Sequence, residues 1–176
     1  MVVGARDRGS ARRVVLGVGS NLGDREAQLR AAVGAWGDEV TAVSDVFETA
    51  PVGGPDQGPF LNLVLVLRTA TSAAEVLARG QALEAAAGRV RIERWVPRPL
   101  DVDGRWIDGE THDRAELTVP HPRMFERAFV TVPLADFAPD LVAGRDVPTD
   151  QEVRRLGPLG STSPAAAEED VPRGVG

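Results

Sequence analysis

The 176-residue chain contains no cysteine, no tyrosine and no lysine, and two of these absences exclude whole classes of mechanism. Without cysteine there is no disulfide framework, no thiolate nucleophile and no thiolate-bound metal. Without lysine there is no Schiff-base chemistry and no P-loop, because that motif requires a phosphate-binding lysine. The two histidines, His112 and His121, leave little room for a histidine-rich metal site.

The charges that remain are unbalanced toward the acidic side. Twenty arginines face 26 acidic residues, for a formal net charge of −6, whereas binding to nucleic acid requires a basic face. The chain is 43% hydrophobic, enough for the core of one domain. No apolar run approaches the roughly 18 residues of a membrane span, and no stretch near the start has the length of a signal peptide. We therefore expect a cytoplasmic protein that binds neither nucleic acid nor membrane.

Composition divides the chain into three parts. Residues 1–12 are rich in glycine and arginine and lack periodicity, so we expect a flexible N-terminal arm. Residues 156–176 contain proline, glycine, serine and acidic residues with almost nothing to bury. Such a segment cannot offset its ordering entropy, and we expect a disordered C-terminal tail. The folded domain is then 13–155.

Periodicity within 13–155 predicts four strands and two helices in the core. The strands are expected over 14–18, 40–49, 60–67 and 98–106. The first helix is expected to follow a cap at Asn21 or Asp24 and to end near Gly37, and the second is opened by the capping-box pair Ser72 and Glu75. The first helix carries an apolar face made of Leu22, Leu29, Val33 and Trp36.

The element order β-α-β-β-α-β is that of a ferredoxin-like core. We therefore predict an α+β fold with an antiparallel sheet. Extra C-terminal helical segments are expected over 129–134, with a last turn over 150–155.

The sharpest local feature is Asp101-Val102-Asp103. Residues i and i+2 of a strand point to the same side with Cα atoms about 6.6 Å apart, and two such carboxylates can hold a pair of Mg²⁺ ions. Alternatively, both acids are simply solvated at a strand edge. Arginines 89, 91, 94, 98 and 105 surround the pair in an otherwise acidic protein, which favours phosphate binding over a charged surface loop.

Two further polar residues admit two interpretations each. Asn62 is the only polar residue within 60–67, and it either reads the edge of a flat heterocycle stacked on Phe60 or bonds to the Pro/Gly-rich loop before it. His121 either donates to a phosphate or is an ordinary loop residue.

Six blocks of sequence, in order, resemble the 6-hydroxymethyl-7,8-dihydropterin pyrophosphokinase family. They are residues 16–24 (LGVGSNLGD), 49–53, 56–62, 88–91, 94–103 (RWVPRPLDVD) and 117–129 (LTVPHPRMFERAF). The resemblance implies a monomeric ATP-dependent diphosphotransferase of folate biosynthesis. Such an enzyme transfers pyrophosphate from MgATP to the hydroxymethyl group of the pterin and releases AMP.

The resemblance also implies roles for particular residues. Those implied in catalysis are Arg89, Arg91, Asp101 and Asp103, the two aspartates also holding two Mg²⁺ ions. Those implied in ATP binding are Gln81, Glu84, Arg98, Thr118, His121 and Arg127. Those implied in pterin binding are Thr49, Pro51, Val52, Phe60, Asn62, Trp95 and Phe129.

Two other hypotheses stay open at this point. A catalytically weak paralogue that binds nucleotide or pterin as a regulator is favoured by Val96 and by Gly104-Arg105, which depart from the family's pattern. An unrelated Mg²⁺-dependent phosphohydrolase on the same core would need Asp101 and Asp103 but would have no use for Asn62.

Overall fold

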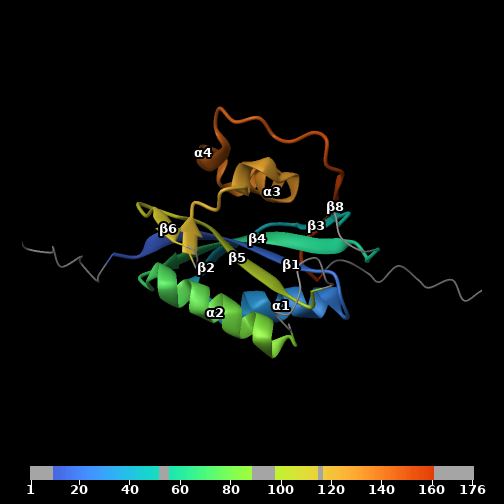
Figure 1. The fold of residues 1–176 in the computed structure, drawn as a ribbon, viewed down its shortest axis with the longest axis horizontal. Coiled ribbons are helices and arrows are strands. Elements are labelled where there is room, and N and C mark those ends of the chain that lie inside the picture. Colours follow the sequence, from blue (N-terminus) through green and yellow to red (C-terminus); the bar gives the residue numbers. More distant parts are fainter. Residues whose placement is uncertain (1–9, 52–55, 89–97, 115–116, 161–176) are drawn as a thin grey trace, which may run out of the picture.

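The computed structural model describes residues 10–51, 56–88, 98–114 and 117–160. In chain order its elements are β1 (Arg12–Ser20), α1 (Arg25–Trp36), η1 (Gly37–Glu39), β2 (Val40–Val43), β3 (Val46–Thr49), β4 (Phe60–Thr69), α2 (Ala73–Ala86), β5 (Asp101–Ile107), β6 (His112–Arg114), β7 (Leu117–Val119), η2 (Met124–Glu126), α3 (Ala128–Phe137), α4 (Pro139–Val142) and β8 (Val153–Gly157). Figure 1 shows α1 and α2 on one face of the main sheet and α3 and α4 on the other.

The main sheet has six strands, in the order β5-β1-β4-β3-β8 with β2 also paired to β4. Every pairing in it is antiparallel. With β2 and β3 taken as one interrupted strand, the core is the predicted ferredoxin-like βαββαβ arrangement, and the helix expected over 129–134 is α3; α4 was not predicted. The fold prediction is confirmed.

Strand alternation gives the sheet two apolar faces. Even-numbered residues of β1, among them Val14, Leu16 and Val18, pack with α1 and α2 in the larger core. On the opposite face Val15 packs with residues of α3 in a second cluster. The chain therefore needs helices on both sides, which the C-terminal segment supplies.

Both predicted helix starts are found in the structure. Asp24 caps α1 by accepting from Ala27 N at 2.9 Å. Ser72 caps α2 by accepting from Glu75 N at 3.3 Å, while the Glu75 carboxylate accepts from Ser72 N at 3.0 Å. Leu22 was wrongly placed on the apolar face of the first helix: it precedes α1 and is 47% exposed.

The strand predicted over 40–49 is divided at Ser44. Between Val43, opposite Leu65, and Phe47, opposite Asn62, this strand advances four residues while β4 advances three. The Ser44 hydroxyl takes the place of a ladder carbonyl and accepts from Val64 N at 2.9 Å. A side-chain oxygen competing with the backbone thus creates a bulge-like interruption.

The C-terminal region differs from its prediction. The last turn expected over 150–155 is wrong: β8 (Val153–Gly157) pairs antiparallel with β3 at the sheet edge. The expected domain limits are also narrower than the folded part, since Arg12 belongs to β1 and Leu156 and Gly157 belong to β8. Residues 1–9 and 161–176 lie outside the described residues, so the arm and the tail stay predictions. Among the described residues, no helix combines the length and apolarity needed to cross a membrane.

Candidate active site

The α3 face of the sheet is open along one half, and its residues there include glycines and polar residues beside Phe60. Val18 and Val102 pack in the core beneath the sheet. Their neighbours along β1 and β5, among them Gly19 and Asp101, therefore face α3. In the register, Gly19 lies opposite Asn62 on one side and opposite Asp101 on the other. Gly19 thus forms a floor without a side chain between the amide of Asn62 and the carboxylate of Asp101.

A cavity of about 820 Å³ stands over this floor. Eight of the predicted site residues line it: Thr49, Pro51, Phe60, Asn62, Arg98, Asp101, Arg127 and Phe129. They come from β3, β4, β5, the start of α3 and the loops after β3 and before β5, so the fold brings together segments far apart in the sequence. Phe60 and Phe129 are both half-buried, and each offers an aromatic ring to the cavity.

Asn62 is held in a fixed orientation at the base of this cavity. Its side chain is 6% exposed, and its Nδ2 donates to Thr49 Oγ1 at 2.9 Å. A Cβ atom at Gly19 would lie 2.7 Å from Asn62 Oδ1. The amide therefore has a structural partner in β3, and it also faces the cavity; residues 52–55 of the Pro/Gly-rich loop lie outside the described residues.

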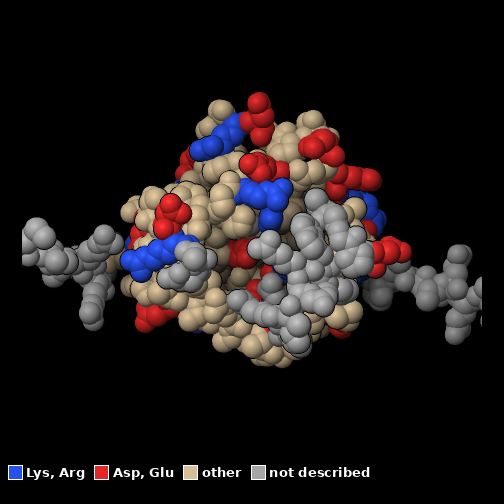
Figure 2. All heavy atoms as spheres, in the orientation of Figure 1, with Lys and Arg blue, Asp and Glu red and all other residues tan. Residues whose placement is uncertain are grey.

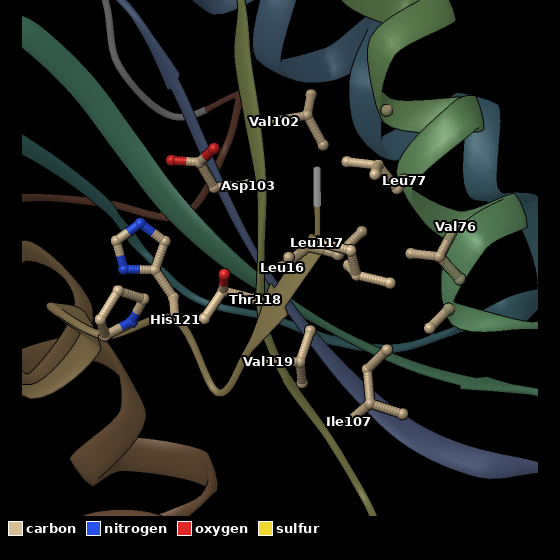
Figure 3. Close-up of a pocket in the computed structure, with 14 residues that line it drawn as sticks. Leu16, Val76, Leu77, Val102, Asp103, Ile107, Leu117, Thr118, Val119 and His121 are labelled. Atoms are coloured by element: carbon tan, nitrogen blue, oxygen red, sulfur yellow. The ribbon is translucent and has the colours of Figure 1, made fainter. Parts of the chain in front are cut away.

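A second cavity, of about 260 Å³, lies between α2, β5 and β7. Asp103, Thr118 and His121 line it, with Val76 and Leu77 on the apolar side. Figure 3 shows Asp103 and Val102 on opposite sides of β5, with Asp103 on the side of Thr118 and His121. The cavity is thus apolar at one end and polar at the other.

Each of the two cavities is lined by one of the two aspartates. Asp101 lines the larger cavity and Asp103 the smaller one, and both side chains are half-buried. Arg98 Nη1 lies 3.1 Å from Asp101 Oδ1. In this strand Arg105 is the extra residue of a β-bulge, because Val15 pairs with Trp106 and Leu16 with Gly104. Bulges are frequent next to active sites.

Two predicted ATP-binding residues lie away from both cavities. Gln81 is exposed on α2. Glu84 is buried, at 2% exposure, and accepts from Val102 N at 2.9 Å. Its carboxylate thus contacts the backbone of β5 between the two aspartates. Glu84 supports the carboxylate pair from behind, whereas the sequence placed it against the nucleotide.

Four predicted site residues, Val52, Arg89, Arg91 and Trp95, lie outside the described residues. The described residues beside those segments converge on Asn21, which is 7% exposed. Asn21 Oδ1 accepts from Arg98 N at 2.7 Å, and Asn21 Nδ2 donates to Gln57 Oε1 at 2.9 Å. The sequence suggested Asn21 only as a helix cap.

Sequence reasoning missed the cavity residues Gly17 and Gly19, and the C-terminal residue Gln151. The two glycines did leave a signal, because alternate glycines in a buried strand indicate close approach of another group. Gln151 left none. On the face seen in Figure 2, acidic and basic side chains of the described residues are interspersed, with no extended single-signed region.

A family model described as 7,8-dihydro-6-hydroxymethylpterin-pyrophosphokinase matches residues 15–139, which is more than half of the chain. The chain belongs to this family. It is 41% identical over 146 residues to the 2-amino-4-hydroxy-6-hydroxymethyldihydropteridine pyrophosphokinase of Bacillus subtilis, covering 80% of this chain and 87% of that protein. The proteins of the same name from Mycobacterium bovis and Methylorubrum extorquens are 47% and 40% identical, covering 69% and 84% of this chain and 70% and 96% of theirs.

Solved structures agree on the fold. A Plasmodium falciparum HPPK-DHPS chain, crystallised with pterin and p-hydrobenzoate, superimposes with a TM-score of 0.56 at 12% identity. The match covers 82% of this chain and 43% of that one, so this chain spans less than half of the solved protein. The curated relatives favour a pyrophosphokinase of folate biosynthesis over the weak paralogue and the phosphohydrolase.

Proposed function

We propose that the larger cavity binds the pterin, the smaller cavity binds the nucleotide, and the phosphates lie between them at Asp101 and Asp103. The reaction transfers pyrophosphate from ATP to the hydroxymethyl group of 6-hydroxymethyl-7,8-dihydropterin and releases AMP. One observation carries this assignment: carboxylates two residues apart on β5 line different cavities. A group bound in one cavity is therefore adjacent to a group bound in the other.

The chemistry of the larger cavity supports a flat, polar-edged heterocycle. Aromatic rings such as Phe60 and Phe129 offer faces for stacking. The carboxamide of Asn62 carries both donors and an acceptor, so it can pair with the alternating donors and acceptors of a pterin edge. Its bond to Thr49 orients it before substrate arrives.

Cationic and hydrogen-bonding groups surround the proposed phosphate position. Arg98 and Arg127 line the larger cavity, and Thr118 and His121 line the smaller one. Guanidinium groups bind phosphate oxygens through paired hydrogen bonds. We propose that Arg89 and Arg91, which lie outside the described residues, also bind the triphosphate.

Asp101 and Asp103 fit a magnesium site. They present two half-buried carboxylates on the α3 face of β5, and the described residues contain no cluster of three or more potential metal ligands. Mg²⁺ prefers one or two carboxylates together with substrate phosphate oxygens, so a pair is sufficient. We propose that the pair holds two ions. When bound, Mg²⁺ supplies charge neutralisation on the phosphate oxygens.

The residues of the chain then act mainly by positioning. The pterin hydroxyl attacks the β-phosphorus of ATP, the bond from the β-phosphorus to the bridging oxygen of the α-phosphate breaks, and AMP leaves with that oxygen. The hydroxyl proton passes to water, which balances the transfer. Stacking in the larger cavity and arginine contacts hold the attacking and leaving oxygens in line, which is the main catalytic contribution in phosphoryl transfer.

We further propose that the protein acts as a monomer in the cytoplasm, where ATP is available. Residues of this single chain line both cavities. A second copy is therefore not needed to complete either one.

Release of AMP from MgATP, with and without the pterin, tests the proposed function. AMP should form only when the pterin is present. Asp103→Asn should lower turnover by about 10²–10³-fold or more, because an amide holds Mg²⁺ poorly and the phosphates then lose the cation that neutralises their charge. The melting temperature should change little. Asp38→Asn, at an exposed position in η1, is the matched control and should retain wild-type turnover. AMP formation independent of pterin, or normal turnover by Asp103→Asn, would refute the assignment.

A further inference from the structure

The segment between α4 and β8 contributes a contact to the larger cavity. From 145 to 152 it contains neither helix nor strand, and it crosses from the α3 layer to the sheet edge (Figure 1). Its residues Asp150 and Gln151 line the cavity that also contains Arg127 and Phe129. The family model ends at residue 139, before this segment begins.

The side chain of Gln151 makes two hydrogen bonds, one to the main chain on each side of Arg127. Its Oε1 accepts from Ala128 N at 3.0 Å, and its Nε2 donates to Glu126 O at 2.7 Å. Arg127 lies between these two backbone groups. Both ends of one carboxamide are thus used to fix the main chain on either side of an arginine that faces the cavity.

The helix start makes this contact necessary. α3 begins at Ala128, and its N-cap residue, Arg127, provides no side-chain cap hydrogen bond. The first N–H groups of a helix need an acceptor from elsewhere. Gln151 supplies one from a distant part of the chain, while the carbonyl of Arg127 already accepts from Val130 N and Thr131 N at 3.0 Å each.

We propose that Gln151 is a positioning residue that holds Arg127 and Phe129 in their binding orientation. This inference rests on the proposed function, in which Phe129 stacks on the pterin and Arg127 binds phosphate. With the Gln151 bonds removed, substrate binding has to order the backbone at 126–128 itself. That ordering cost raises the dissociation constant of the pterin.

Three variants separate this role from a purely structural one. Gln151→Met keeps the length of the side chain and removes both hydrogen bonds. Gln151→Glu keeps an acceptor for Ala128 N but places a second acceptor against Glu126 O. Arg155→Gln is the structural comparator, since it removes ion pairs of the following strand, β8, with Asp45, at 2.9 Å, and with Asp136, and Arg155 does not line the cavity.

The experiment measures pterin binding by fluorescence, the KM for each substrate, and the melting temperature. Each neutral hydrogen bond is worth a factor of about two to twelve in an equilibrium constant. Gln151→Met should therefore raise the dissociation constant and the KM of the pterin about tenfold. Because Arg127 binds phosphate, binding of a non-hydrolysable ATP analogue with Mg²⁺ should weaken as well, by about two- to twelvefold, and Gln151→Glu should be intermediate. Arg155→Gln should lower the melting temperature and leave pterin binding unchanged.

Hydrogen exchange provides a readout independent of turnover. The amide of Ala128 should exchange faster in Gln151→Met and at the wild-type rate in Arg155→Gln. If Gln151→Met lowers only the melting temperature and leaves pterin binding within twofold, Gln151 is structural and the inference is overturned. A wild-type chain that binds no pterin would overturn the proposed function and this inference together. A wild type that binds and turns over the pterin leaves the decision to the Gln151 variants alone.

Discussion

Gly19→Ala should separate the stability of this protein from its pterin binding. The new Cβ atom would lie 2.7 Å from Asn62 Oδ1, which is shorter than any ordinary contact, and 3.8 Å from the Leu61 carbonyl oxygen. The backbone is therefore not obstructed, and the group that has to move is the end of a side chain. Oδ1 has to shift by about half an ångström to restore normal contact.

The two effects on stability nearly cancel. Alanine in a strand avoids the entropic cost of glycine, about 0.5–1 kcal/mol. Rotation of the amide strains its 2.9 Å bond to Thr49, and the net contribution of such a bond is about 0.5–1.5 kcal/mol. The free energy of unfolding should change by less than about 1 kcal/mol, which corresponds to a shift of the melting temperature of at most about 4 °C.

Pterin binding should respond much more strongly. A rotated Asn62 amide loses alignment with the substrate edge, and a polar group left unpaired in a buried site costs about 1–3 kcal/mol. That cost corresponds to a dissociation constant about 5- to 150-fold higher, with ATP binding unchanged. Calorimetric titration with the pterin and with a non-hydrolysable ATP analogue measures both constants.

Gly34→Ala is the matched control, because its added Cβ meets nothing within 4 Å on α1. It should raise helix stability by about 1 kcal/mol and leave both ligands unaffected. If Gly19→Ala binds pterin as the wild type does, Asn62 does not read the substrate. If the melting temperature of Gly19→Ala drops by more than about 8 °C, the backbone of the sheet has moved in place of the Asn62 side chain.

Three further predictions concern acid stability, the nucleotide cavity and the tail. A hydrogen bond from Thr69 and the ion pair with Arg79 hold the pKa of Glu39 below its ordinary value of 4.5. The stability that ionised Glu39 contributes is therefore complete above pH 4.5 and lost as the pH falls through the lower folded-state pKa, so the difference in unfolding free energy between wild type and Glu39→Gln should shrink in that range. Arg12 donates to Thr71 O at 2.7 Å, just before α2, and pairs with Glu110, just before β6. Because Arg12 thereby holds the chain at the start of α2, whose Val76 and Leu77 line the smaller cavity, Arg12→Gln should raise the KM for ATP about three- to tenfold, with that of the pterin unchanged; equal increases in both would contradict this effect through α2. Deletion of residues 161–176 should leave the melting temperature unchanged, because their composition offers little to bury, and a large decrease would disprove a disordered tail.

Local chemistry made much of this structure predictable. Asp24 and the Ser72–Glu75 pair identify their helix starts because capping depends on residues three apart. Strand alternation places Asp101 and Asp103 on one face whatever the rest of the chain does. These inferences needed no knowledge of tertiary contacts.

Other features depend on partners that no local pattern identifies. β8 contains Arg154 and Arg155 and has little apolar character, so its strand conformation comes from pairing with the edge of β3. Gln151 is a polar residue in a polar stretch until it meets the start of α3. Glu84 lies one helical turn after Gly80, on the buried face of α2, but nothing local identifies its partner, the N–H of Val102 in β5. Tertiary context decides each of these cases.

The position of the site follows from how the sheet is covered. Val15 and Val66 continue the apolar α3 face at one end, where α3 and α4 pack on it. At the other end that face holds Gly19, Asn62 and Asp101, which offer a helix no apolar surface to bury, and Phe60, whose ring lines the cavity. A covering helix there would desolvate a carboxylate at a cost of several kcal/mol, whereas MgATP would bring the cation that neutralises it. These polar residues and glycines break the apolar pattern of the sheet, and they therefore prevent a helix from covering this half. They also define the chemistry of the ligand that covers it instead.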